Sequence, residues 1–141
     1  MLRDGRVFSG EIFLNPISRH RIAPEQPAEY FNQPDPFFVL APTYDERVLI
    51  AKHSVAIVEA PLPTSDDEDS LDTARVGVGV EIELTGLTLT AIGWLFYRAT
   101  AGKGRVQDYL NDFQDQFIVL FDAEKTTLVN RHAVACVRET P

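Results

Sequence analysis

One stretch of sequence occurs twice in this chain of 141 residues. Residues 27–61 read PAEYFNQPDPFFVLAPTYDERVLIAKHSVAIVEAP, and residues 106–141 read VQDYLNDFQDQFIVLFDAEKTTLVNRHAVACVRETP. With a shift of 79 or 80 positions, polar and apolar residues coincide in the same order, among them Tyr30 with Tyr109, Asn32 with Asn111, Phe37 with Phe117, Leu49 with Leu128 and His53 with His132. Because chance explains a shared Tyr-x-Asn and His less easily than shared apolar positions, the sequence predicts an internal duplication.

A short acidic segment separates the two copies. Residues 61–75 hold five acidic side chains against Arg75, so they carry half of the net charge of −8. Their like charges repel one another and they have little to bury, which favours a flexible linker that acts as a spacer or as an acidic docking segment. The predicted division is a first repeat over 1–60, the linker over 61–75 and a second repeat over 76–141.

The second copy begins with two predicted strands. Residues 76–84 alternate apolar residues with Gly or Glu, which is the pattern of a strand with one buried face. Residues 87–97 are rich in Thr, Leu and aromatic residues, and Gly93 in their middle predicts a bulge or a sharp bend.

The first copy begins almost at the turn between its own two strands. We expect a corresponding hairpin over residues 2–14, with a turn at Asp4-Gly5 and with Gly10 opposite Gly93. Its leading strand is therefore missing or supplied from elsewhere, or else the natural start lies upstream of Met1.

The rest of each copy predicts one short helix and three more strands. Apolar residues at helical spacing favour a helix over 105–113, and Pro34 stops its counterpart over 27–32. Two strands with a turn between them follow, and the second of these is broken near Asn130, so that a last strand comes after the break. A sheet this small buries its apolar face by curling. We therefore expect a mainly β fold with short helices, built as two partly closed barrels about a pseudo-twofold axis.

The order of these features resembles small SH3-like barrels of the Sm-like kind. The Gly93, Asp108 and Asn111 positions are similar to that family's first motif, and residues 129–132 take the place of its second motif, with His132 where the family has Gly. The chain is also similar to bacterial domains of unknown function that share GRxxDYLN and LVNRxxV segments. The Sm-like resemblance implies binding of single-stranded RNA or DNA.

No set of residues in the sequence predicts catalysis. Residues 99–105 contain two Gly and a Lys but lack the spacing of a phosphate-binding loop. Cys136 corresponds to Ile57 in the other copy, which favours a buried structural thiol over a nucleophile. The three His residues are far apart in sequence. We expect no enzyme activity, no cofactor and no metal.

The polar residues shared by the two copies are the candidate interaction residues: Lys52, His53, Tyr109, Asn111, Arg131 and His132. The exposed Lys-His and Arg-His pairs contact a phosphate or an acidic partner in one interpretation. In the other, the His side chains bond the backbone and hold the turn. Asn32 and Asn111 are expected to bond the backbone near their helix ends.

These observations favour a non-catalytic protein-interaction module, with single-stranded nucleic-acid binding as the alternative. Each repeat carries a net charge of −2, which disfavours nucleic acid. More aromatic residues are present than two small cores need, and Tyr and Trp are favoured at interfaces. The aromatic residues that this argument offers for an interface are Tyr30, Phe31, Trp94, Phe96, Tyr97 and Tyr109. No apolar run is long enough to span a membrane and the N-terminus has no secretory signal, so we expect a cytoplasmic protein. If the two copies pair with each other through a strand edge, the chain is a monomer or a homodimer.

Overall fold

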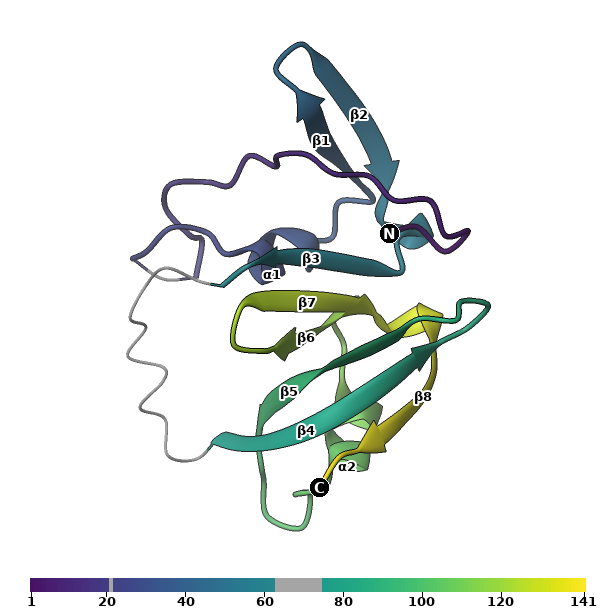
Figure 1. Ribbon diagram of the computed structural model, residues 1–141. Coiled ribbons are helices and arrows are strands. Elements are labelled where there is room, and N and C mark those ends of the chain that lie inside the picture. The colour runs from purple at the N-terminus through teal and green to yellow at the C-terminus, as the bar shows by residue number, and fades with distance from the viewer. Residues whose placement is uncertain (21, 63–74) are drawn as a thin grey trace.

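The computed structural model describes residues 1–20, 22–62 and 75–141 (Figure 1). The fold is mainly β, as the sequence predicts, with 46% of the described residues in strands and a few short helices. Most of the predicted linker lies outside the described residues. Its described residues are Pro61, Leu62 and Arg75. None of the helices in the described ranges has the length and apolar character needed to cross a membrane.

The C-terminal half contains two long strands, a helix, a hairpin and a final strand. Their bounds are β4 (Arg75–Leu84), β5 (Thr90–Arg98), α2 (Val106–Asp112), β6 (Phe117–Phe121), β7 (Lys125–Asn130) and β8 (Val134–Glu139). β4 buries Val80, Ile82 and Leu84, which confirms the one-sided strand predicted over residues 76–84. β5 lies within the strand predicted over residues 87–97, apart from its last residue, and buries every second residue. The β4–β5 register continues past Gly93 without a shift, so the expected bulge is absent.

The N-terminal half has the same later elements in the same order. Their bounds are α1 (Pro27–Phe31), β1 (Phe37–Thr43), β2 (Glu46–Ala51) and β3 (Ile57–Pro61). A short 3-10 turn precedes the last strand of each half, at Lys52–Ser54 and at Arg131–Ala133.

The hairpin predicted over residues 2–14 is only partly formed. Its turn is present, since Gly5 has a φ of +89° and its N–H donates to the Leu2 carbonyl at 3.0 Å. The flanking residues make isolated bridges instead of strands, from Leu2 to Val55 and from Glu11 to Ala41. Without a long strand such as β4 beside them, these residues have no continuous ladder to join.

The strands form two sheets, and one of them contains strands from both halves. β1 and β2 form a two-stranded sheet, while the six-stranded sheet has the order β3-β7-β6-β5-β4-β8. β3 of the N-terminal half lies antiparallel to β7, from Ile57 opposite Val129 to Pro61 opposite Lys125 (Figure 1). A twofold arrangement would also pair β8 with β2, but in the described chain β2 pairs with β1 alone. The expected pseudo-twofold arrangement is therefore not seen in the strand pairing, and neither half is a closed barrel.

Two apolar cores lie on either side of the β3–β7 junction. The C-terminal core is built from its own half together with Ala56 and Ile57. The N-terminal core includes Phe117 and Leu128, which are fully buried although they belong to the C-terminal half. The Phe117 ring meets Phe31 edge to face, with the ring centroids 5.7 Å apart. Each half thus needs side chains of the other to complete its core.

Candidate interaction sites

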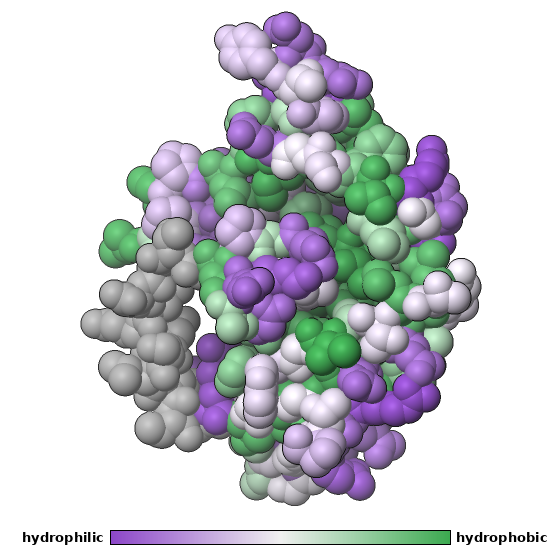
Figure 2. Space-filling model, in the orientation of Figure 1, coloured by the Kyte–Doolittle hydropathy of each residue, from purple (hydrophilic) through white to green (hydrophobic). Residues whose placement is uncertain are grey.

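An apolar groove of about 530 Å³ opens in the N-terminal half. The N-terminal segment, α1, the β1–β2 hairpin and β3 line it with mostly apolar side chains, among them Leu2, Phe8, Ile12, Phe31, Leu40 and Val58. Figure 2 shows apolar residues gathered across this half, beneath the polar tip of the hairpin. An apolar concavity of this size is typical of a binding site.

The groove lies beside an unpaired edge of β3. One edge of β3 pairs with β7, and at the other edge the Met1 amino group donates to the Ile57 carbonyl at 2.7 Å. Backbone groups of alternate residues point to the same side of a strand, so the N–H and C=O of Glu59 face this open edge. In the described chain no strand lies on this side of β3, whereas β4 covers the equivalent side of β8.

Lys52 and Arg131 point into the protein and hold the turns. Lys52 is only 2% exposed, so the expectation of an exposed Lys-His pair is wrong at this position. Its Nζ donates to the carbonyls of Gln33 at 2.9 Å and Tyr30 at 3.4 Å, at the end of α1. Burial lowers the pKa of Lys52, and the nearby Asp35 opposes this effect. Arg131 donates to the Phe113 carbonyl at 2.6 Å in the corresponding place after α2.

The two shared His residues are exposed at the centres of the two 3-10 turns. The backbone N–H of His132 donates to the side chain of Asn130 at 3.0 Å, and its Nε2 accepts a 3.4 Å bond from Arg131. The imidazole of His132 is thus partly engaged by its neighbour, whereas no described residue bonds the His53 side chain. Binding of a partner by His53 and His132 stays a prediction.

The two shared Asn residues have different roles. The side chain of Asn32 bonds both backbone groups of Phe117, accepting from its N–H at 2.8 Å and donating to its carbonyl at 3.2 Å. It therefore links the two halves in addition to ending α1. Asn111 is exposed and its side chain bonds no described residue, so the predicted backbone bond is wrong there. Asn32, in contrast, reaches the start of β6, whose backbone groups its side chain bonds.

Tyr109 packs within the C-terminal half. Its ring stacks on Tyr97 with the centroids 5.0 Å apart, and burial raises the pKa of its hydroxyl. Among the other aromatic residues expected at an interface, Phe31 and Tyr97 are buried in the cores. Trp94 and Phe96 are exposed on β5, so they alone of these four are available for contacts.

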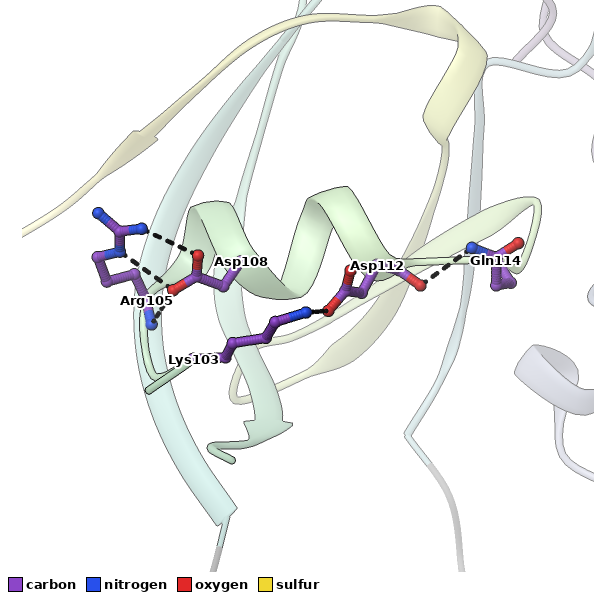
Figure 3. A network of polar contacts seen from close by, with 5 residues as sticks. All are labelled: Lys103, Arg105, Asp108, Asp112 and Gln114. Carbon is purple, nitrogen blue, oxygen red and sulfur yellow. Dashed lines mark hydrogen bonds and ion pairs between the residues drawn. The ribbon is translucent and has the colours of Figure 1, made fainter. Parts of the chain in front are cut away.

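The basic residues around α2 are paired with acidic residues, as Figure 3 shows. Arg105 makes two 3.0 Å hydrogen bonds to Asp108, and Lys103 lies 3.0 Å from Asp112. The hydrogen bonds from Arg105 hold the pKa of Asp108 below its usual value. The loop before α2 therefore presents no free cation from Lys103 or Arg105 for a phosphate.

Cys136 lies half-buried on β8 and not in a core, contrary to the sequence-based expectation. Its thiol donates to Glu83 at 3.2 Å, and this bond raises the pKa of Cys136. A raised pKa keeps the thiol protonated and weakly nucleophilic.

One polar residue that the sequence comparison missed lies at the centre of the fold. Asn130 is fully buried, and its Nδ2 donates to the Val55 carbonyl at 2.8 Å, from one half to the other. The first copy has Ala51 in this place. A search restricted to shared polar residues therefore passes over Asn130, although an Asn within an apolar strand is itself a signal of a buried bond.

Comparison of the chain with family models, with known proteins and with solved structures gives no match.

Proposed function

We propose that this protein is a non-catalytic interaction module, and that its N-terminal groove binds an extended segment of a partner protein. The segment adds to the free edge of β3 as a further strand. The observation that carries this proposal is the apolar groove of about 530 Å³ beside an unpaired strand edge. Such edges recruit peptide strands through their backbone groups, while apolar pockets select side chains.

β4 indicates what kind of segment fits. At the corresponding edge of β8, β4 pairs from Val80 to Leu84 and turns three alternate apolar side chains into the C-terminal core. A partner segment in the groove would have the same requirement, with apolar residues at every second position. Glu59 supplies the backbone N–H and C=O that such a strand would use.

The similarity of the halves supports an origin from one small SH3-like or Sm-like barrel that was duplicated. The turn at Asp4-Gly5 and the turn after β4 are each held against a 3-10 turn by a backbone hydrogen bond. The Arg3 N–H donates to the Ser54 carbonyl and the Thr85 N–H donates to the Ala133 carbonyl, each at 2.8 Å. In this interpretation the groove is the side of the first barrel that β4 closes in the second.

Single-stranded nucleic-acid binding, the alternative, has less support. Such binding needs a basic groove with stacking aromatic residues. Lys52 is buried, Arg131 bonds Phe113, and Lys103 and Arg105 are paired with carboxylates. The charged side chain that lines the N-terminal groove is the acidic Glu59, which would repel a phosphate.

A synthetic peptide with the sequence of β4, residues 75–84, tests the proposal. We expect it to bind the full chain and to shift the NMR signals of Met1, Leu2 and β3. In a Glu59→Pro variant the N–H that faces the groove is lost while the pairing to β7 is kept. Affinity should fall about tenfold, which corresponds to about one hydrogen bond.

Glu59→Ala is the matched control, because it removes the same carboxylate, including its 2.5 Å contact with Lys125, and keeps the N–H. It should bind as the unchanged protein does. The proposal is overturned if the peptide does not bind, or if its signals map to β5 or β8. Tight, salt-dependent binding of a labelled single-stranded RNA would instead favour the alternative.

A further inference from the structure

Two strand edges at opposite ends of the protein are unpaired. In the described chain β8 pairs with β4 alone, and β2 pairs with β1 alone. In Figure 1, β2 belongs to the hairpin at the top and β8 borders the lower right of the protein. Exposed strand edges are ready templates for pairing with another chain.

These edges are the unused counterparts of an interface that the chain already contains. The β3–β7 junction joins the last strand of the N-terminal half to the second hairpin strand of the C-terminal half. β8 is the last strand of the C-terminal half, and β2 is the second hairpin strand of the N-terminal half. If the junction is repeated, the partner that fits β8 is the β2 of another copy.

The exposure of corresponding side chains supports this match. Leu128 and Phe117 are completely buried, because they enter the core of the neighbouring half. Their counterparts Leu49 and Phe37, 79 and 80 positions earlier, are 70% and 57% exposed. Large apolar side chains that are this exposed on a two-stranded sheet are typical of an interface without its partner.

The polar contact at the junction also has an unused counterpart. Asn32 holds both backbone groups of Phe117 within the chain. Asn111 is exposed, and its side chain bonds no described residue. By correspondence with Asn32 and Phe117, the side chain of Asn111 would bond the backbone of Phe37, which is also exposed, in another copy. Both members of this second pair are therefore present, but on different sides of one molecule.

The charges are complementary at the matching positions. At the junction, Glu59 of β3 pairs with Lys125 of β7 at 2.5 Å. The positions 79 residues away hold Arg138 on β8 and Glu46 on β2, so the signs are exchanged but remain opposite. Glu46 is exposed, and Arg138 is exposed while bonded to Glu83. An antiparallel β8–β2 pair in the junction's register would bring Arg138 and Glu46 together.

We infer that copies of this chain associate head to tail, with β8 of one copy pairing with β2 of the next. Leu49 and Phe37 of one copy enter the C-terminal half of the other beside α2. There they meet Leu110, which corresponds to Phe31 in the N-terminal half. Head-to-tail contacts close into a ring when the rotation between copies allows it. The inference does not rest on the N-terminal groove, which is a different edge.

Charge reversal in the full chain tests this association. We expect sedimentation equilibrium over roughly 5 to 500 µM to give a multiple of the 15.8 kDa chain mass. Arg138→Glu should weaken association about tenfold or more, because it brings two carboxylates together at diagonal positions of the strand pair. The double variant Arg138→Glu with Glu46→Arg should restore it, which a merely destabilised fold would not do.

Two further variants separate the interface from the rest of the surface. Leu49→Ser should abolish association, whereas Tyr44→Ser, at a 97% exposed residue of the hairpin turn, should leave it unchanged. Glu59→Pro, which impairs peptide binding in the groove, should also associate normally. Association and peptide binding can then fail independently of each other. A chain that is monomeric over the whole concentration range, or an oligomer that is insensitive to Leu49→Ser and Arg138→Glu, overturns the inference.

Discussion

Individual amide groups connect the two halves, and one ammonium group holds the N-terminal half together. Asn32 bonds the backbone of Phe117, Asn130 bonds Val55, and Lys52 bonds the carbonyls that end α1. Each of these groups satisfies backbone polar atoms where regular pairing ends. A buried polar atom left without its partner costs more free energy than a typical bond contributes, so these few residues have large effects on stability.

The bond pair made by Asn32 predicts a measurable loss of stability. In Asn32→Ala, the N–H and carbonyl of Phe117 lose their partners, and the free energy of unfolding should fall by about 1 to 3 kcal/mol. Urea denaturation at a fixed protein concentration measures this change. Gln114→Ala removes another amide, which is exposed and bonds only the Asp112 carbonyl, and should change stability by less than about 0.5 kcal/mol. Equal effects of the two substitutions would contradict the role of Asn32.

At the scale of elements, the N-terminal segment is held against β1 by a close backbone approach. The bridge from Glu11 to Ala41 consists of two 2.9 Å hydrogen bonds. A Cβ on Gly10 would lie 2.5 Å from the Ala41 carbonyl oxygen, and one on Gly93 would lie 3.0 Å from the Phe121 carbonyl oxygen. Glycine is thus required where the segment crosses β1, and the predicted correspondence of Gly10 and Gly93 has a common physical reason.

This close approach predicts how strongly three Gly→Ala substitutions destabilise the protein. Gly10→Ala pushes a methyl group into the backbone of β1 and should lower the free energy of unfolding by about 1 to 3 kcal/mol, with a smaller loss for Gly93→Ala. In Gly104→Ala the new Cβ meets nothing closer than 3.8 Å, so stability should stay nearly unchanged. Thermal and urea unfolding measure all three variants. A Gly10→Ala protein as stable as Gly104→Ala would show that the segment does not lie against β1.

At the scale of the whole molecule, the junction makes the two halves one folding unit. β3 supplies a strand to the C-terminal sheet, and Phe117 and Leu128 supply side chains to the N-terminal core. Neither half retains a complete core when the other unfolds. The energetic unit is therefore larger than either copy in the sequence.

The shared cores predict a single cooperative unfolding transition. The native NMR signals of Phe38 in the N-terminal core and of Ile82 in the C-terminal core should disappear at the same urea concentration. Leu128→Ala, which leaves a cavity in the N-terminal core, should shift both midpoints together and cost about 2 to 5 kcal/mol. Two separate midpoints, or a shift of the Phe38 signal alone, would show that the halves unfold independently.

Local sequence patterns determined the elements. The alternation over residues 76–84, the helical spacing near Val106 and the proline after α1 predicted strands and helices close to their observed bounds, because these patterns depend on neighbouring residues. The mainly β class follows from them. The repeated Tyr-x-Asn and His placed corresponding turns and helix ends in both halves.

Only the tertiary structure decided which strands pair and which polar residues are free. β3 and β8 have similar patterns, and nothing local to them specifies that β3 joins β7 while β8 and β2 stay open. Likewise, Lys52 follows an apolar strand at a turn, where a lysine is usually solvated, but the carbonyls at the end of α1 enclose it. Strand pairing and burial depend on residues distant in sequence, so both the groove beside β3 and the open edges follow from how the halves pack.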